Sequence, residues 1–551
     1  MRNNILFLCL LIFGVSEAQK IKKEDKQLLT SFQRHIEYLA SDSLEGRRVG
    51  TPGEQKAMAY ISREFKNIGL LPKGESDYYQ SFEINEGKQV NTVTHLLVGG
   101  QSLLLAKHFI PLSFSPNSSI EALPSMAIQE VQMPWFFNLK ETLQEATSNP
   151  HFDIYIFIKA KANELKLKGA TALFIYNTSA IDDNIEFKPK DASAATPIPV
   201  VYVTKEAIKK YFNDPEATLD VKLKIDIGIK KRSGNNVIGF IDNNAGTTVV
   251  VGAHFDHIGY GEDGNSLSAG IKQVHNGADD NASGVAALIE LARLLKGSTL
   301  KQNNYLFIAF SGEELGLYGS KYFVQHPSID LSKVNYMINM DMIGRLSGAS
   351  PVLTVGGFGT SPTWRTAYSS SGKKGVSYES LKFKFDSSGT GPSDHTSFYL
   401  HNIPVLFYFS GLHLDYHKPS DDFDKINYNG QLAIVKHIYS LIDWQTRTIS
   451  KLAFTKTKET SSASTASFSV TLGIMPDYTF SGTGLRIDGI SENKPAQKAG
   501  LKTGDVIIQL GDYATNNIEQ YMQALGGFKK GDKTKVQVIR GMEKLFFPIE
   551  F

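Results

Sequence analysis

Short apolar runs alternate with helical patterns in the middle of the chain, between about residues 236 and 447. The runs are TVVVGA (248–253), YLFIAF (305–310), NYMINM (335–340) and IPVLFYF (403–409). Between them, stretches such as GVAALIELARLL (284–295) space their apolar residues as a helix does. Strands that are apolar throughout belong to sheets covered on both faces. The pattern predicts an α/β domain, with a mostly parallel, mixed sheet sandwiched by helices.

The segments before and after this region follow other patterns. Glu54–Ile68 has helical spacing and ends at Gly69, a suitable C-cap, and the Gly/Pro-rich stretch Gly46–Gly53 before it predicts a loop. Between 91 and 232, β-like runs alternate with polar loops, which predicts a separate β-rich insert. The polar stretch TKTKETSSASTAS (455–467) is typical of a flexible linker.

The N-terminus has the layout of a secretory signal. Arg2 precedes the apolar run Ile5–Val15, and Ser16 and Ala18 form a small-x-small cleavage pattern. We expect cleavage after Ala18 and a secreted or periplasmic protein. An uncleaved anchor is the alternative, although the run is short for a span. No later stretch is long and apolar enough to span a membrane.

Cysteine usage and charge exclude several classes. Cys9, the only cysteine, lies inside the signal, so the mature chain has no disulfide, thiolate zinc ligand or cysteine nucleophile. A net charge of +2 over 551 residues argues against a partner that is nucleic acid or a membrane surface. The length predicts two or three domains.

These observations predict six segments. They are a signal peptide (1–18), the N-terminal part of the α/β domain (19–90), the insert (91–232), the main α/β domain (233–450), a linker (451–467) and a small β-rich domain (468–551).

Acids and histidines follow the predicted strands. In open α/β sheets, function lies in the loops at the carboxyl ends of the strands. Two histidines with several carboxylates suit one or two divalent metal ions, zinc first. The candidates at these positions are His254, Asp256, His257, Asp279, Asp280, Glu313, Glu314, Asp341, Tyr416 and His417.

The adjacent pair Glu313 and Glu314 predicts two different roles. Two metal ions about 3.5–4 Å apart need a bridging carboxylate, terminal ligands and a free carboxylate to act as base. If the pair begins a helix, the two side chains point about 100° apart. One glutamate would then bind metal while the other takes a proton from water.

Five motifs in order resemble the co-catalytic di-zinc aminopeptidase family, which is related to glutamate carboxypeptidase II and the glutaminyl cyclases. The N-terminal stretch YLASDSLEGRRVGTPGEQKAMAYI is similar to the opening of bacterial members. The resemblance implies the zinc exopeptidase fold. The five motifs are GAHFDH, GADDNASGVA, FSGEELGLYGS, NMDMIG and YHKPSDD.

Carried over motif by motif, the resemblance implies two zinc ions per chain. His254, Asp280 and Asp341 would hold one, and Asp280, Glu314 and His417 the other, with Asp280 as the bridge. Glu313 would be the general base, Asp256 would orient His254, and Tyr416 would donate to the developing oxyanion. The family also implies a cis peptide after Asp280.

Alternatives stay open at several of these positions. His395 competes with His417 as the last ligand, and Asp279 competes with Asp280 as the bridge. Asp341 could be a helix N-cap, and Tyr416 a packing residue. The other histidines, His257, His275 and His413, are interpreted as loop residues or as partners of ligands.

The outer domains have their own resemblances. The insert resembles a protease-associated domain, chiefly through its position and the stretch LKGATALFIYN. The tail resembles a bacterial PDZ domain, with LGIMPD as the loop that would receive the C-terminus of a protein partner.

Together these features imply a zinc exopeptidase that cleaves the N-terminal residue from peptides with a free amino end. A carboxypeptidase or a glutaminyl cyclase of the same fold is the first alternative. A catalytically dead scaffold that binds peptides is the second.

Overall fold

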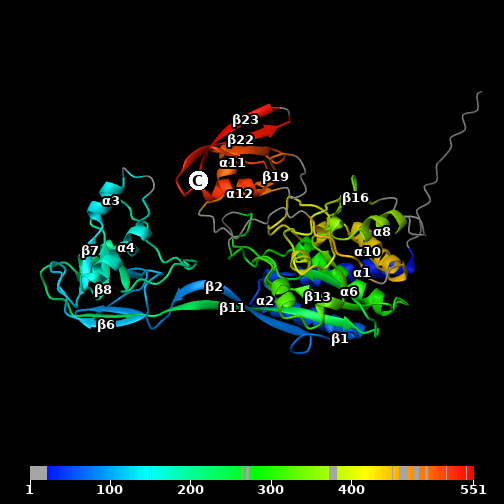
Figure 1. Cartoon of the computed structure of the whole chain (residues 1–551), viewed down its shortest axis with the longest axis horizontal. Helices are drawn as coiled ribbons and strands as arrows, with labels where there is room; N and C mark the ends of the chain where they lie inside the picture. The colour runs from blue at the N-terminus through cyan, green and yellow to red at the C-terminus, as the bar shows by residue number, and fades with distance from the viewer. Residues whose placement is uncertain are drawn as a thin grey trace, which may run out of the picture. The chain divides into compact units, whose positions relative to one another are not determined.

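The computed structural model describes residues 22–147, 149, 152–263, 265–268, 272–371, 381–448, 451–457, 470–476, 483–490, 494–516, 518–541 and 543–551. The predicted signal segment lies outside them, and the predicted linker lies partly outside. The chain forms two compact units, residues 83–232 and the remainder (Figure 1). No helix among the described residues has the length and apolar character needed to cross a bilayer.

A nine-stranded mixed sheet organises the α/β domain. Its order is β1-β11-β13-β12-β14-β17-β15-β16, and β2 also pairs with β11. The central strands β13, β12, β14 and β17 run parallel, whereas β11 and β15 are antiparallel to their neighbours β13 and β17. The strands are β1 (Leu71–Pro72), β2 (Tyr79–Val90), β11 (Ile227–Ile241), β12 (Thr248–His254), β13 (Asn304–Phe310), β14 (Val334–Met340), β15 (Val352–Gly356), β16 (Lys382–Phe385) and β17 (Val405–Phe409).

Helices cover both faces of this sheet, which confirms the predicted fold class. Alternate residues of β13 enter two separate cores: Tyr305 and Phe307 pack with one set of helices, and Leu306 and Ile308 with the other. The first set is α1 (Lys23–Leu39), α2 (Pro52–Ile68), α6 (Gly284–Lys296), α8 (Thr363–Ser371) and α10 (Tyr428–Thr448). The second set is α7 (Tyr318–Gln325) and α9 (His395–Tyr399).

Helix α2 forms as its sequence predicts but begins two residues earlier, at Pro52. The Thr51 side chain caps the helix through the Glu54 N–H, and Gly69 ends it in the left-handed conformation at φ +81°. Within the predicted loop Gly46–Gly53, Gly46 and Arg47 close the segment η1 (Asp42–Arg47) with left-handed φ values of +67° and +46°, residues 48–51 belong to no helix, and only Pro52 and Gly53 depart from the prediction by starting α2. Proline at the first helical position explains the early start, because its φ is already helical.

The described residues of unit 83–232 form two four-stranded sheets and three helices. The orders are β4-β3-β10-β6 and β5-β9-β8-β7. Two apolar clusters, which meet on the second sheet, hold this unit together. The elements are β3 (His95–Val98), β4 (Gln101–Leu103), β5 (Phe109–Pro111), β6 (Ser118–Ala122), β7 (Pro134–Asn138), α3 (Lys140–Ala146), α4 (Ile154–Leu167), β8 (Ala172–Tyr176), β9 (Val200–Val203), α5 (Lys205–Tyr211) and β10 (Val221–Ile225).

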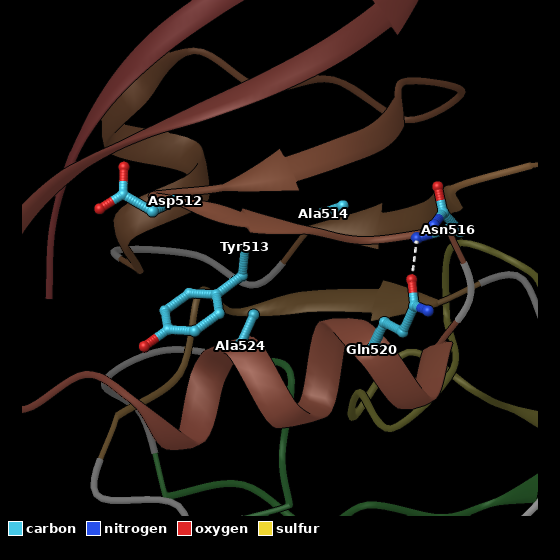
Figure 2. A pocket seen from close by; sticks show the side chains of 6 residues that line it. All are labelled: Asp512, Tyr513, Ala514, Asn516, Gln520 and Ala524. Atoms are coloured by element: carbon cyan, nitrogen blue, oxygen red, sulfur yellow. Dashed lines mark hydrogen bonds between the residues drawn. The ribbon is translucent and has the colours of Figure 1, made fainter.

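The C-terminal domain is a six-stranded sheet with two short helices around its own apolar cluster. A cavity of about 410 Å³ lies beside α12 and β21, lined by Tyr513, Gln520 and Ala524 among others (Figure 2). The elements are β18 (Ile474–Pro476), β19 (Leu485–Ile490), α11 (Pro495–Ala499), β20 (Val506–Leu510), β21 (Tyr513–Ala514), α12 (Ile518–Gly526), β22 (Lys533–Arg540) and β23 (Glu543–Glu550).

Candidate metal centre

The carboxyl ends of the four central strands bring the predicted site residues together. His254 is the last residue of β12, and Asp341 directly follows β14. Glu313 and Glu314 follow β13, and His417 lies in the loop after β17. Because these strands are parallel, all four ends lie at one edge of the sheet.

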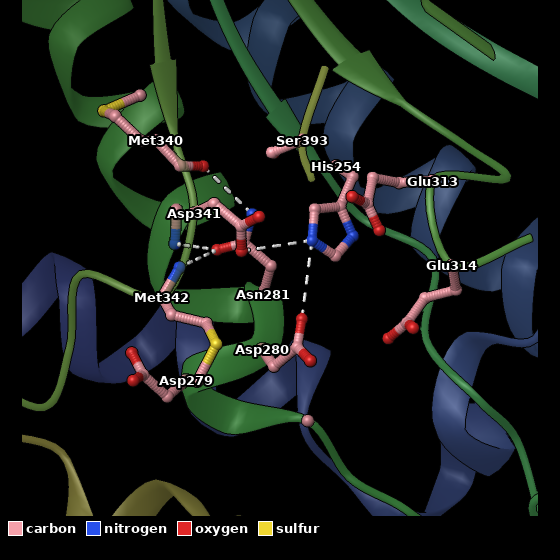
Figure 3. Close-up of polar contacts among 12 residues, drawn as sticks. His254, Asp279, Asp280, Asn281, Glu313, Glu314, Met340, Asp341, Met342 and Ser393 are labelled. Carbon is pink, nitrogen blue, oxygen red and sulfur yellow. Dashed lines mark hydrogen bonds and ion pairs between the residues drawn. The ribbon is translucent and has the colours of Figure 1, made fainter. Parts of the chain in front are cut away.

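One group of potential ligands is His254, Asp280 and Asp341. The His254 Nε2 atom lies 3.3 Å from Asp341 Oδ1 and 3.4 Å from Asp280 Oδ1. One ligand atom from each residue lies within 4.8 Å of the other two, a spacing that suits a shared metal ion. Figure 3 shows the His254 ring directed between the two carboxylates.

A second group shares Asp280. The His417 Nε2 atom lies 3.0 Å from Glu314 Oε2 and 3.3 Å from Asp280 Oδ2. His257 reaches the same two carboxylates: its Nδ1 atom lies 2.8 Å from Glu314 Oε1 and 3.8 Å from Asp280 Oδ2. Asp280 therefore directs one oxygen toward each group, as a bridging carboxylate does.

His257 lies among the potential metal ligands, a role that the sequence did not predict for it. The sequence predicts a loop residue or a partner of a ligand here, yet with Asp280 and Glu314 His257 forms a group that could hold a metal ion. Its position three residues after His254, in the stretch HFDH, was the available signal. That spacing alone does not predict that the loop turns the His257 ring toward Glu314.

The loop that carries Asp280 is shaped by close backbone contacts. Gly277 has φ +56°, and a Cβ there would lie 2.1 Å from the Asp280 carbonyl oxygen and 2.6 Å from His257 Cδ2. Only glycine fits this position. The peptide bond between Asp280 and Asn281 is cis, and Asn281 Oδ1 accepts the Gly284 N–H at the start of α6.

Glu313 and Glu314 lie on a turn, which corrects the expectation that they begin a helix. Helix α7 starts only at Tyr318. The Asp256 carboxylate explains the turn, because it accepts the N–H groups of Glu313 (3.1 Å) and Glu314 (3.4 Å). His254 Nδ1 contacts the main-chain oxygen of Asp256 at 3.2 Å and lies 3.7 Å from its carboxylate, so Asp256 connects the histidine to the glutamate turn.

The two glutamates experience opposite electrostatic environments. Burial, with the nearby Asp341 and Asp394 carboxylates, raises the pKa of Glu313 well above its ordinary value. Burial opposes the Glu314 carboxylate too, but His417 and His257 outweigh it and hold the pKa of Glu314 well below 4.5. Neighbouring carboxylates with pKa values pushed apart take different chemical roles.

The donor set fits divalent cations such as zinc. Within the described part of the chain, Asp280, Glu314 and Asp341 form ion pairs only with histidines. A neutral histidine does not balance the charge of a carboxylate, and an unbalanced buried charge is costly. The facing carboxylates raise the pKa of His254 and of His417 well above 6.5, against the effect of burial. The carboxylates thus favour positive charge on the histidines. A divalent cation bound to neutral histidines would supply that positive charge instead of the protons.

Asp279, the rival for the bridge, points away from this cluster. Its Oδ1 atom accepts the Ser283 hydroxyl (2.9 Å) and the Gly344 N–H (2.6 Å), and its Oδ2 atom lies 3.2 Å from His413 Nε2. The alternative that Asp341 caps a helix is wrong, because no helix begins there.

His395, the rival for the last ligand, is buried against an aromatic ring. It stacks on Phe407 with ring centroids 4.5 Å apart, and its Nδ1 atom has no hydrogen-bond partner among the described residues. The Tyr416 ring stacks on His417 at 3.9 Å, a contact that also suits a packing role. His275 Nε2 contacts the Ser266 hydroxyl at 2.8 Å.

We predict that His395 makes the fold sensitive to acid. Burial lowers the pKa of His395 to about 3, against about 6.5 in the unfolded chain. A base with a lowered pKa contributes stability that is complete above pH 6.5 and is lost as the pH falls toward 3. The loss from pH 7 to pH 5 is about 2 kcal/mol.

Unfolding of the wild type and of His395→Phe at both pH values, with chelator present, checks this prediction. The drop in unfolding free energy between pH 7 and pH 5 should be smaller in the variant by that amount. An equal drop in both proteins would mean that His395 does not titrate as its burial implies.

A protein-family model matches the segment that carries these residues. Residues 236–442 match the model of peptidase family M28. This segment is a family M28 peptidase domain. Residues 456–550 match the PDZ domain model, so a PDZ domain follows the M28 domain.

Relatives of the M28 domain include named aminopeptidases. The chain is 28% identical to aminopeptidase YwaD of Bacillus subtilis over 279 residues, 48% of this chain and 55% of that protein. It is 31% identical to an aminopeptidase of Pseudomonas aeruginosa over 188 residues, 33% of this chain and 32% of that protein. The matches thus span about half or less of each relative's length.

The solved structures that match this chain include a zinc aminopeptidase from Bacillus subtilis. It matches with a TM-score of 0.41 and 22% identity, over 77% of this chain and 98% of that one. An aminopeptidase from Aneurinibacillus sp. strain AM-1 matches with a TM-score of 0.41 and 23% identity, over 78% and 97%.

Proposed function

We propose that the protein is a zinc-dependent aminopeptidase that removes the N-terminal residue of peptides. The observation that carries the proposal is the shared carboxylate Asp280, with His254 and Asp341 on one side and Glu314 and His417 on the other. The M28 family match and the aminopeptidase relatives support the same reaction.

Two zinc ions would be held by the two groups that meet at Asp280. His254, Asp280 and Asp341 would bind one ion; Asp280, Glu314 and His417 would bind the other, with His257 close enough to contribute. When bound, the metal pair supplies Lewis acidity toward the peptide carbonyl and lowers the pKa of water. The mixed nitrogen and oxygen donors are those that zinc prefers.

Glu313 is proposed as the general base. Its side chain lies beside the His254 ring and belongs to neither ligand group (Figure 3). A nearby dication favours the ionised carboxylate and so brings its raised pKa back toward the working range. Glu313 would then accept a proton from the attacking water and return it to the departing amine.

Two further residues would assist. Asp256 would hold His254, which it contacts through its main-chain oxygen, and its carboxylate would fix the turn that aims Glu313 and Glu314. Tyr416 would donate a hydrogen bond to the developing oxyanion, from its position beside His417.

The other segments are proposed to handle location and partners. The N-terminal signal would send the protein to the periplasm or out of the cell. Unit 83–232 would act as a protease-associated domain. The PDZ domain would bind the C-terminus of a protein or peptide, although the loop predicted for this (472–477) reaches beyond the described residues.

A pair of matched substrates tests the proposed reaction. We expect the protein to hydrolyse leucyl-p-nitroanilide and to leave the N-acetylated compound intact. Chelation should abolish the reaction and added zinc should restore it. Turnover of only blocked or carboxyl-terminal substrates would reassign the reaction within the same fold.

A further inference from the structure

Arg47 is a buried arginine that contacts the metal-centre loops from a distant part of the sequence. It ends the 3-10 helix η1 and is 1% exposed. Among the described residues, it forms no ion pair with a carboxylate. A guanidinium without a partner acid in the protein interior is costly, so its contacts require a reason.

All five N–H donors of Arg47 point at main-chain carbonyls. The Nε atom donates to Phe255 O at 2.8 Å. The Nη1 atom donates to Leu39 O (2.5 Å) and Asn276 O (2.6 Å). The Nη2 atom donates to Gly277 O (2.9 Å) and, at the long distance of 3.5 Å, to Asp280 O. Arginine alone offers five donors in a fixed plane.

Four of these carbonyls belong to the two loops that carry potential ligands. Phe255 lies between His254 and His257, and the carbonyls of Asn276 and Gly277 lead into Asp280. One planar group thus fixes the spacing between a loop after β12 and the loop before α6. Three potential ligands lie on or directly beside these loops, namely His254, His257 and Asp280.

The backbone beside Arg47 makes further contacts with the same region. Its carbonyl oxygen accepts the His257 N–H at 3.3 Å, and the Gly46 carbonyl accepts the Gly259 N–H at 3.1 Å. Gly46 has φ +67°, and a Cβ there would lie 2.6 Å from His275 O. The N-terminal segment is therefore built closely against the metal-centre loops.

The charge of Arg47 also suits this place. A guanidinium stays protonated at neutral pH, and the carboxylates of Asp280, Asp256, Asp421 and Glu314 interact favourably with its charge. It therefore supplies a permanent positive charge beside a surplus of carboxylates. Arg47 provides this charge without itself being one of the potential metal ligands.

We propose that Arg47 is a positioning residue of the metal centre, holding the loops of His254, His257 and Asp280 in the spacing that zinc binding requires. This inference rests on the proposed zinc site. It assigns a role to the GRRVG part of the N-terminal segment, more than 200 residues before the ligands in sequence.

The experiment measures zinc binding by Arg47→Lys and Arg47→Met in the chain from residue 19 to residue 551. Apparent zinc affinity is measured by competition with a chelator, at a temperature where circular dichroism shows the apo-protein folded. Arg48→Met is the matched control, because the neighbouring Arg48 binds the Asp263 carboxylate instead, at 2.8 Å. Leu295→Ala is a core control, about 16 Å along α6 from its first turn.

Arg47→Met should weaken zinc binding by about 10- to 100-fold, the usual effect of losing a group that orients ligands. Arg47→Lys should weaken it less, because it keeps the charge with fewer donors. Both should show a smaller zinc-induced rise in thermal midpoint than the wild type. Leu295→Ala should lower the midpoint of the apo-protein but keep the full zinc-induced rise.

Two results would overturn the proposal while leaving the zinc site standing. The first is wild-type zinc affinity in a folded Arg47 variant. The second is failure of both variants to fold, which would make Arg47 a general folding residue. If the wild type itself binds no zinc, the proposed function fails instead, and the inference fails with it.

Discussion

Glu313→Gln is expected to bind zinc as the wild type does and to lose about 10²- to 10⁴-fold in kcat, the range for removal of a general base. Glutamine keeps the shape of the side chain but cannot accept the proton. Zinc is retained because Glu313 belongs to neither ligand group. Metal content by atomic spectroscopy and initial rates on leucyl-p-nitroanilide measure the two effects separately.

The adjacent Glu314 supplies the matched control. Its carboxylate lies within 3.0 Å of both His257 Nδ1 and His417 Nε2, so Glu314→Gln should lose zinc together with activity. Retention of zinc by Glu314→Gln with loss of zinc from Glu313→Gln would reverse the two roles. High activity in Glu313→Gln would show that another group is the base.

Asp280→Asn is expected to disable both metal positions at once. Asp280 directs Oδ1 toward His254 and Oδ2 toward His417, so one carboxylate serves both groups. Asparagine replaces one of those oxygens with an NH₂ group that cannot bind a cation. We expect zinc affinity to fall by at least about 100-fold and activity to fall with it, measured by chelator competition and by rates at saturating zinc.

Asp279→Asn is the control for this prediction, since it alters the neighbouring buried acid. Asp279 binds Ser283, Gly344 and His413 rather than the ligand groups. Its variant should unfold at a lower temperature but bind zinc when folded. Loss of zinc from Asp279→Asn alone would make Asp279 the bridge.

The central strands of the sheet could be predicted because the apolar runs that mark them are local sequence patterns. The four central strands lie within two residues of their predicted bounds, since each is buried on both faces and reads as an apolar run. The start of α2 was less predictable, because the Gly/Pro-rich stretch predicted a loop through Gly53, yet Pro52 already begins the helix.

The site was predictable in composition but not in detail. Residues at the ends of parallel strands had to meet, which brought His254, Glu314 and Asp341 together. The turn at Glu313 depends on Asp256, which lies 57 residues earlier in the chain, and no local pattern reveals that contact. His257 was predicted only as a loop residue or a partner of a ligand, and Arg47 was not predicted at all, because their contacts arise from loops that meet only in the fold.

Zinc titration of the apo-protein, with activity recorded at each addition, tests the central claim most directly. We expect binding to saturate at two zinc ions per chain and cleavage of leucyl-p-nitroanilide to appear only with bound metal. Full activity in metal-free protein, or no zinc bound at saturation, would contradict the assignment of this cluster as a metal centre.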